Sequence, residues 1–330
     1  MLRSVYLFRS GRLARRGNTV CFEAEDGAKY LPVESIRDIY AFSELDLNKR
    51  ALEFLSEKEI LVHFFNHFGY YVGTFYPREH YNSGHLILQQ AAAYLDPTRR
   101  MGLARAFVHG ALANIARVLR YYHTRGHAVG EALQAVEGLA GRTGEAPDVE
   151  RLMAVEGQAR DAYYQAWDQI LQDPDFAFEA RSRRPPANRL NALISFGNSY
   201  LYTVVLSEIY KTHLDPRIGF LHATNFRRFS LNLDVAEIFK PIVVDRAIFT
   251  LVGRRQIQAK HFAFEEEGVL LEEEARRTFV EELERRLQTQ LEHRRLHQRV
   301  TYRRLVRLEL YKIEKDLLGD HPYEPYIAPW

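Results

Sequence analysis

The sequence predicts an α+β protein with two domains, a small β-sandwich-like domain at residues 1–78 and a larger, all-helical domain at residues 79–330. Three observations lead to this prediction. A chain of 330 residues exceeds most single hydrophobic cores. Short apolar runs separated by turn residues fill roughly the first 75 positions. From His85 onward, the apolar residues recur instead at helical spacing.

The amino-terminal domain is predicted to be β-rich with one helix. Its expected strands span residues 5–8, 19–22, 29–33 and 36–42. Turn residues such as Gly11 and Gly17 separate these strands. Apolar residues at helical spacing predict a short helix at 48–58, and the apolar segments 60–65 and 70–75 predict a hairpin.

The second domain is predicted to consist of long helices joined by loops. Helices are expected at residues 85–95, 98–123, 127–142, 148–172, 190–213, 234–252, 271–287 and 300–318. The segments 141–147 and 173–186 are predicted loops, and residues 253–270 an irregular or hairpin insertion. The tail at 321–330 contains too many prolines for a helix and is expected to be mobile.

The composition excludes several classes of protein. The single cysteine, Cys21, excludes an intramolecular disulfide framework and a multi-cysteine zinc site, and it fits a reducing compartment. Charged residues interrupt the first apolar run too often for a signal peptide. No stretch approaches the roughly 20 apolar residues of a membrane span. We therefore expect a soluble, cytoplasmic protein with no membrane partner.

The charge is balanced overall but its distribution is uneven. The chain has 45 Lys and Arg against 43 Asp and Glu, a net charge of +2, which does not by itself indicate a nucleic-acid partner. Arginines occur as doublets at 99–100, 183–184, 227–228, 254–255, 294–295 and 303–304. Arginine can bind phosphate oxygens in a bidentate manner, although many of these side chains would also suit solvated helix faces. The segment 181–189 has four arginines and no acidic neighbour, which favours phosphate contact there.

Glu156 is the first residue with a plausible chemical role. Gly157 follows it inside a helical pattern, where glycine costs about 1 kcal/mol relative to alanine. Close approach of another backbone or of a ligand beside the carboxylate would explain this glycine. Glu156 also borders an apolar face, where a carboxylate requires a cation or several donors. The alternative is a surface glutamate at a bend of the helix.

A second polar group follows the apolar stretch 218–221. It begins with His222, and the segment Ser230–Asp234 is expected to cap the next helix. Asp234 and Glu237 are three residues apart, so both carboxylates are expected to point at one place. Lys240 lies one turn further along that face. Helix N-termini favour acidic residues for dipole reasons, which explains Asp234 better than Glu237.

An imidazole together with two or three carboxylates is a suitable set of donors for Mn²⁺ or Mg²⁺. It lacks the sulfur or the several histidines that are typical of zinc sites. Such ions orient the attacking oxygen in phosphodiester chemistry and neutralise the charge that develops on the phosphate. The spacing does not show that Glu156 meets His222 in space, so the residues alone give a metal-dependent phosphotransfer enzyme as one hypothesis among others.

A set of motifs runs in order along the whole chain: Ser10–Leu13, Pro32–Ile39, Phe68–Pro77, Met153–Gly157, Arg184–Tyr202, Gly219–His222 and Ser230–Pro241. Together these motifs resemble those of the CRISPR-associated endonuclease and integrase of spacer acquisition, the Cas-one family. Any one of these segments is weak evidence, but their combination and order are highly specific.

The resemblance implies a metal centre and a set of DNA contacts. Glu156, His222 and Glu237 would ligate Mg²⁺ or Mn²⁺, and Asp234 would be an accessory acidic group of the catalytic site. The expected contacts to the DNA backbone are Arg183, Arg184, Arg227, Arg228 and Lys240. Asn198 stands where some family members have a tyrosine, which favours direct metal-assisted attack over a tyrosine nucleophile.

The resemblance also implies an activity and partners. The 3′-hydroxyl of a short DNA duplex would attack a phosphodiester of the CRISPR array and insert a spacer, as part of antiviral defence. Family members also cut branched DNA by the same chemistry. The protein would be a homodimer formed through the small domain, and two such dimers would flank a dimer of the small Cas-two protein.

Two other functions are consistent with the residues. One is a metal-dependent DNA-repair nuclease without integration activity. The other is a DNA-binding scaffold without catalysis, in which substitution of Glu156 or His222 would leave all activity and metal affinity unchanged.

Overall fold

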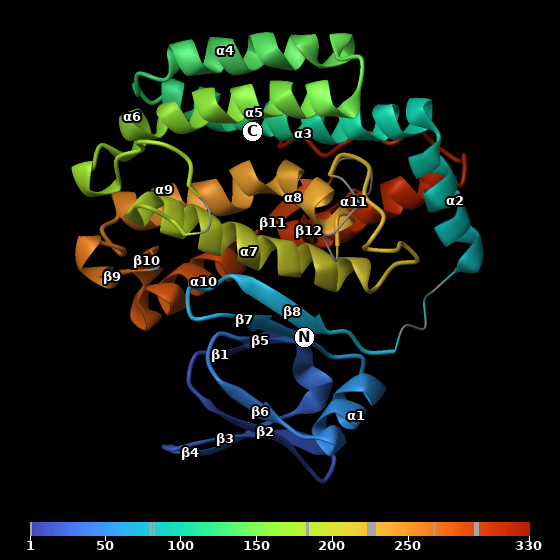
Figure 1. Ribbon diagram of the computed structural model, residues 1–330, viewed down its shortest axis with the longest axis vertical. Helices are drawn as coiled ribbons and strands as arrows, with labels where there is room; N and C mark the ends of the chain where they lie inside the picture. Colours follow the sequence, from blue (N-terminus) through green and yellow to red (C-terminus); the bar gives the residue numbers. More distant parts are fainter. Residues whose placement is uncertain are drawn as a thin grey trace. The chain divides into compact units, whose positions relative to one another are not determined.

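The computed structural model describes residues 2–78, 81, 83–182, 185–222, 229–266, 268–293 and 297–330. The chain forms two compact units, Met1–His80 and Tyr81–Trp330 (Figure 1). The first unit contains β-sheets and the second is mostly helical, so the predicted fold class is confirmed.

Two four-stranded sheets form the first unit. One has the order β1 (Arg3–Leu7), β5 (Ile36–Ala41), β7 (Leu61–Phe65) and β8 (Tyr71–Phe75). The other has the order β4 (Gly27–Leu31), β3 (Thr19–Ala24), β2 (Gly11–Arg16) and β6 (Leu45–Leu47). The neighbours β1, β5 and β7 are parallel, whereas β7–β8, β2–β3 and β3–β4 are antiparallel.

Both sheets contribute to one hydrophobic core, as expected for a sandwich. Leu13 and Val20 come from one sheet, Ile39 and Val62 from the other, and all four are completely buried. Phe54 of α1 (Lys49–Glu57) joins them. Burial of these side chains stabilises each sheet against the other, since each fully buried aliphatic side chain contributes about 1.5–3 kcal/mol.

The sequence did not predict β2 and β6. In β2 only two adjacent residues, Leu13 and Ala14, are buried, and arginines flank them, so the strand shows no alternation of apolar and polar residues. β6 has three residues and none is buried, which leaves no apolar pattern to detect.

The second unit contains ten α-helices among its described residues. They are α2 (Gly84–Leu95), α3 (Pro97–His123), α4 (Gly130–Gly141), α5 (Val149–Gln165), α6 (Trp167–Leu171), α7 (Arg189–Ile209), α8 (Leu231–Lys240), α9 (Arg246–Gly253), α10 (Glu273–Leu287) and α11 (Tyr302–Leu317). Most begin and end within a few residues of the predicted bounds. Their starts have local causes: Asp96 accepts hydrogen bonds from the first backbone N–H groups of α3, and Asp148 does the same for α5.

The helix α3 connects the elements that carry the candidate site. It packs against α4 and α5 on one side and against α8 on another, and α8 also packs against α7 (Figure 1). All residues of α7 except Arg189 and Tyr202 are buried, as expected for a helix inside a helical domain. The predicted site residues of α5 and α8 are thus held by one shared helix.

Two predicted helices are interrupted. The segment 148–172 divides at Ala166 into α5 and α6, and the segment 234–252 contains a π-helical turn at Pro241–Asp245 between α8 and α9. Proline has no backbone N–H to continue the α-helical hydrogen bonds, which accounts for the wider turn at that point.

The prediction of an all-helical second domain is wrong in detail. The hairpin β9 (Phe262–Glu265) and β10 (Gly268–Leu271) lies in the segment predicted as irregular or hairpin. A second hairpin, β11 (Gln290–His293) and β12 (Gln298–Thr301), precedes α11. β12 includes the first residues of the helix predicted at 300–318, because Thr301 caps that helix instead of belonging to it.

The carboxyl-terminal tail is not helical, as predicted, but the expectation of mobility is wrong. The side-chain amide of Asn114 in α3 donates to the carbonyl of Tyr326 and accepts from the backbone N–H of Ala328, which is fully buried. The ring of Tyr326 stacks on Phe239 of α8, with the centroids 5.8 Å apart. The tail is therefore part of the support of α8.

None of the helices in the described ranges is long and apolar enough to span a membrane.

Candidate metal centre

Glu156 of α5 and Glu237 of α8 converge on one cation, the guanidinium of Arg160. Arg160 lies one turn after Glu156, and its Nε donates to Glu156 Oε1. Its Nη2 donates to Glu237 Oε2. The structure thus brings together two predicted ligands whose meeting the sequence could not show.

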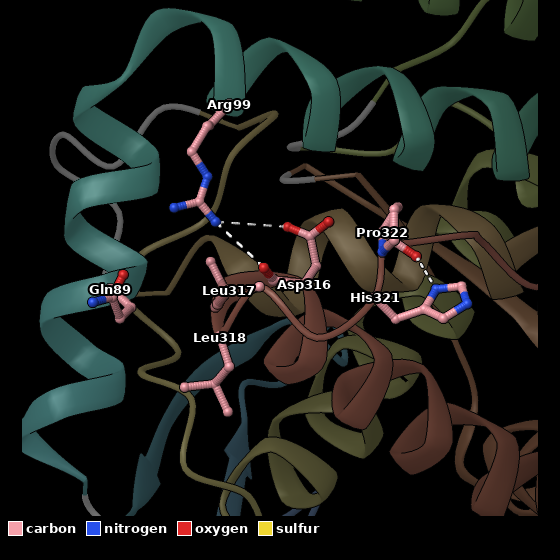
Figure 2. A pocket seen from close by; sticks show the side chains of 8 residues that line it. Gln89, Arg99, Asp316, Leu317, Leu318, His321 and Pro322 are labelled. Atoms are coloured by element: carbon pink, nitrogen blue, oxygen red, sulfur yellow. Dashed lines mark hydrogen bonds and ion pairs between the residues drawn. The ribbon is translucent and has the colours of Figure 1, made fainter.

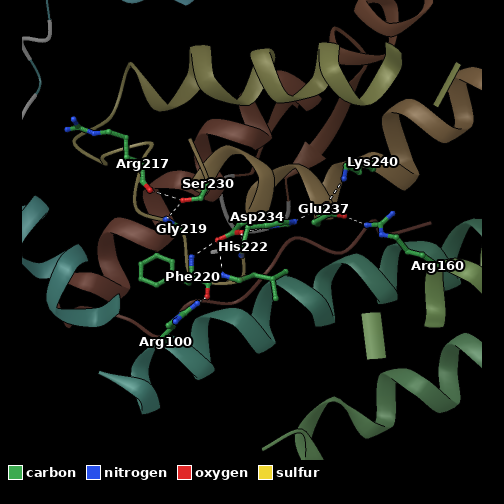
Figure 3. A network of polar contacts seen from close by, with 11 residues as sticks. Arg100, Arg160, Arg217, Gly219, Phe220, His222, Ser230, Asp234, Glu237 and Lys240 are labelled. Atoms are coloured by element: carbon green, nitrogen blue, oxygen red, sulfur yellow. Dashed lines mark hydrogen bonds and ion pairs between the residues drawn. The ribbon is translucent and has the colours of Figure 1, made fainter. Parts of the chain in front are cut away.

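His222 lies beside Glu237 and is oriented by Asp234 (Figure 3). Asp234 is completely buried, and its Oδ1 accepts from His222 Nδ1 at 2.7 Å. Since a carboxylate only accepts, Nδ1 carries the proton and the Nε2 lone pair is left for another partner. Nε2 lies 3.9 Å from Glu237 Oε1. Asp234 and Glu237 therefore face one place, His222, as their spacing predicted.

Three backbone N–H groups complete the environment of Asp234. Oδ2 accepts from the N–H of Phe220 at 2.6 Å and of Leu221 at 3.0 Å, and Oδ1 accepts from the N–H of His222 at 2.9 Å. With four donors, the carboxylate has full hydrogen bonding without a metal ion. Its position fits the carboxylate–histidine pairs that orient metal-binding imidazoles.

Ser230 and Gly219 shape the loop that carries His222. Ser230 stands at the N-cap position of α8 but its hydroxyl does not cap the helix, contrary to the prediction. Its Oγ accepts instead from the N–H of Gly219 at 2.8 Å and donates to the carbonyl of Arg217 at 2.7 Å. A Cβ on Gly219 would lie 2.7 Å from Asp234 Oδ2, so only glycine permits this approach.

Glu237 is buried among positive charges. Lys240 Nζ lies 2.5 Å from its Oε1. Burial alone would raise the pKa of Glu237, but the charges of Arg160 and Lys240 outweigh it and lower the pKa to about 2. Lys240, the predicted phosphate contact, is itself buried, pairs with Glu237 and lies over the ring of Tyr202. Contact between Lys240 and DNA stays a prediction.

The four arginines predicted to contact DNA, Arg183, Arg184, Arg227 and Arg228, lie outside the described residues. The segment just before Arg183 and Arg184 is anchored by Asn191, which lies in the first turn of α7. Its Oδ1 accepts from Arg181 Nη1 at 2.8 Å, and its Nδ2 donates to the carbonyl of Ala180 at 2.8 Å.

Sequence reasoning missed two charged residues of this region. Arg160 follows Glu156 by four residues, and this i,i+4 spacing is the sequence signal for an ion pair. Asp245, in the π-helical turn, is completely buried; burial raises its pKa to about 7, although the charges of Arg160 and Lys240 oppose the rise. An acid after four apolar residues carries no comparable sequence signal.

The surroundings of Gly157 differ from the close approach of another backbone that its position in a helix suggested. No described atom lies within 4 Å of the place where its Cβ would be. A close protein backbone therefore does not explain this glycine, and the ligand alternative remains.

The donor set suits Mg²⁺ or Mn²⁺, but Arg160 fills the point where the donors converge. Within the described ranges, no three His, Cys, Asp or Glu side chains stand in an arrangement that could hold a metal ion. At this site the guanidinium of Arg160 lies between the carboxylates of Glu156 and Glu237. Two carboxylates that share a cation, and an imidazole nitrogen facing one of them, have the chemistry that such an ion requires.

A surface hollow of about 470 Å³ lies elsewhere in the second unit (Figure 2). It is lined by Gln89, Arg99, residues 316–319, His321 and Pro322. Arg99 Nη2 lies 3.9 Å from Asp316 Oδ1 and donates to the carbonyl of the same residue. The charges of this hollow thus neutralise one another, and none of the predicted site residues lines it.

Comparisons with known proteins identify the family of this chain. The family model described as CRISPR associated protein Cas1 matches residues 5–285. A CRISPR-associated endonuclease Cas1 2 of Thermodesulfovibrio yellowstonii is 51% identical over 330 residues, which cover 100% of both chains. This chain belongs to the Cas1 family.

Solved structures show the same fold. A Cas1 protein from Thermotoga maritima is 50% identical and matches with a TM-score of 0.89, over 98% of this Cas1 chain and 100% of the other. A casposase bound to integration product matches with a TM-score of 0.86 at 18% identity, over 99% of this chain and 94% of the other. A Cas6-RT-Cas1–Cas2 complex matches with a TM-score of 0.88 at 18% identity, over 100% of this chain and 36% of the other. At 18% identity these last two matches show the fold alone.

Proposed function

We propose that this Cas1 chain is a divalent-metal-dependent DNA integrase and endonuclease that inserts spacer DNA into a CRISPR array. The observation that carries the proposal is the convergence of Glu156 and Glu237 on one cation beside Nε2 of His222. The name of the endonuclease relative and the fold shared with a casposase bound to integration product support it.

Glu156, Glu237 and Nε2 of His222 would hold Mg²⁺ or Mn²⁺. When bound, the ion supplies Lewis-acid stabilisation of the charge on the attacked phosphate and helps to activate the attacking oxygen. Asp234 keeps the proton on Nδ1 of His222, so that Nε2 stays a ligand. Lys240 and the low pKa of Glu237 keep that carboxylate ionised.

The reaction is a transesterification. The 3′-hydroxyl oxygen of the incoming DNA forms a bond to phosphorus, the bond from phosphorus to the 3′-oxygen of the array strand breaks, and the proton ends on that leaving oxygen. One phosphodiester replaces another, so no energy source is needed. Water in place of the 3′-hydroxyl gives endonuclease activity, including the cleavage of branched DNA.

The assembly consists of two homodimers, each formed through the first unit, which flank a dimer of Cas2 and bind double-stranded DNA in the cytoplasm. Arg183, Arg184, Arg227 and Arg228 would contact the DNA backbone, because guanidinium groups bind phosphate oxygens in a bidentate manner. The fold shared with a Cas6-RT-Cas1–Cas2 complex supports the Cas2 partner.

An integration assay tests the proposal. The protein is incubated with its Cas2 partner, a duplex with 3′-hydroxyl ends, an array plasmid and Mg²⁺ or Mn²⁺, and joined product is measured. We expect Glu237→Gln and His222→Ala to reduce joining about a hundredfold or more, since each removes a metal ligand. Glu137→Gln on the surface of α4 is the matched control and should join normally.

Two results would contradict the proposal. Cleavage by the wild-type protein without any joining would favour a repair nuclease. Full activity of both ligand variants would exclude the metal centre.

A further inference from the structure

Arg160 has an unusual position for an arginine, because it sits between two predicted metal ligands. Its side chain is 11% exposed, and it bonds Glu156 through Nε and Glu237 through Nη2. Its Nη1 is buried and has no hydrogen-bond partner among the described residues. A buried guanidinium with an unused donor is incompletely satisfied, so the protein does not hold it as firmly as it could.

The charges at this point leave no room for an additional ion. Glu156 and Glu237 carry two negative charges, Arg160 and Lys240 carry two positive charges, and the nearby carboxylate of Asp234 adds a third negative charge. A divalent ion added to this group would leave one excess positive charge at a buried site, where like charges repel strongly. If the guanidinium leaves, the charges balance, and both glutamates become available as ligands.

The helix provides space for a displaced side chain. Gly157 and Arg160 are three residues apart and lie on the same face of α5. Around the Cβ position of Gly157 no described atom lies within 4 Å. A side chain at position 157 would occupy that space. The role of Gly157 is therefore to leave room for the displaced side chain of Arg160.

We propose that Arg160 is a built-in competitor of the divalent ion. Its guanidinium holds Glu156 and Glu237 together in the ion-free protein, and it leaves both carboxylates when the ion binds. This inference rests on the proposed metal-dependent function and adds the residue that sets the affinity for the ion. The ion-free protein gains stability from the same contacts that weaken ion binding.

Titration with Mn²⁺, followed by electron paramagnetic resonance of the free ion, tests the proposal on the full-length protein. We expect Arg160→Met to bind Mn²⁺ about tenfold more tightly than the wild type. Its ion-free unfolding midpoint should fall, because the buried carboxylate of Glu237 and the partly buried one of Glu156 lose a partner, and Mn²⁺ should raise that midpoint more than in the wild type. Arg151→Met, an exposed arginine of the same helix, is the control and should change neither quantity.

The outcomes separate this inference from the proposed function. If the wild type binds Mn²⁺, Glu237→Gln does not, and Arg160→Met binds no more tightly than the wild type, Arg160 does not compete and the inference is overturned. If wild type and Glu237→Gln bind Mn²⁺ equally, the metal centre itself is wrong. Should Arg160→Met not fold without the ion, Arg160→Lys decides, because a single ammonium bridges two carboxylates less well and should give two- to threefold tighter binding.

Discussion

The two halves of the candidate metal centre are held by different forces. In the first half, Asp234 accepts four hydrogen bonds, three from backbone N–H groups and one from the imidazole of His222. In the second half, Glu156 and Glu237 are held by the charges of Arg160 and Lys240, and one guanidinium nitrogen has no partner among the described residues. A fully satisfied network fixes geometry, whereas ion pairs around a common point can exchange one cation for another.

This difference assigns the two halves different tasks. The half around Asp234 determines which nitrogen of His222 faces the centre and where it lies. The half around Arg160 determines which cation the carboxylates bind. Single substitutions can disrupt either half while leaving the other in place.

Asp234→Asn should disrupt the hydrogen bonds of the half around Asp234. An amide supplies one acceptor oxygen where the carboxylate satisfies four donors, so buried N–H groups lose their partner and His222 loses its fixed tautomer. We expect Mn²⁺ affinity and DNA joining to fall ten- to a hundredfold, with a loss of about 1–3 kcal/mol of unfolding free energy. Metal titration and urea unfolding measure both, and Asp161→Asn on the exposed surface of α5 is the control. Wild-type affinity in Asp234→Asn would show that His222 needs no orienting partner.

Gly219→Ala should distort the same half without removing any of its polar groups. The added Cβ would lie 2.7 Å from Asp234 Oδ2 and 2.8 Å from the carbonyl carbon of Ser230, so the carboxylate must move. We expect a loss of about 1–3 kcal/mol in unfolding free energy together with weaker Mn²⁺ binding. In Gly102→Ala the new methyl group meets no described atom within 4 Å, and this helical position should be neutral or slightly stabilised. Equal stability of the two variants would contradict the close approach at Gly219.

Asp245→Asn should change how the free energy of unfolding depends on pH. Asp245 belongs to the half around Arg160, whose charge acts on its carboxyl group. The folded-state pKa of Asp245, about 7, lies above its ordinary value of 3.8. The raised pKa therefore adds a contribution to the free energy of unfolding that is fully present below about pH 4. This contribution is lost as the pH rises toward 7, with a slope of up to about 1.4 kcal/mol per pH unit. Urea unfolding between pH 4.5 and 8 should show that the variant lacks this decline and is the more stable protein at pH 8. Parallel profiles for variant and wild type would show that Asp245 titrates normally.

The sequence predicted the parts of the fold that have a strong hydrophobic period. The long helices agree because their apolar faces repeat every 3.6 residues. It failed at β2, where arginines interrupt the alternation, at the hairpin β11–β12, and at the tail, whose burial depends on Asn114 and Phe239 far away in the chain. These features arise from tertiary contacts that no local pattern contains.

The candidate site divides in the same way. Local spacing placed Asp234 and Glu237 on one face, and both do face His222. The meeting of Glu156 with Glu237 depends on α3, which packs against both α5 and α8. The family resemblance, which the comparisons confirm, pointed to these residues but not to the guanidinium between them.

Anomalous diffraction from crystals soaked in Mn²⁺ would locate the ion in the proposed metal centre. We expect a peak bounded by the carboxylates of Glu156 and Glu237 and by Nε2 of His222, with Asp234 still bonded to Nδ1 and Arg160 withdrawn from both glutamates. Crystals without a peak at this point, in which Arg160 still bridges the two carboxylates, would contradict this expectation.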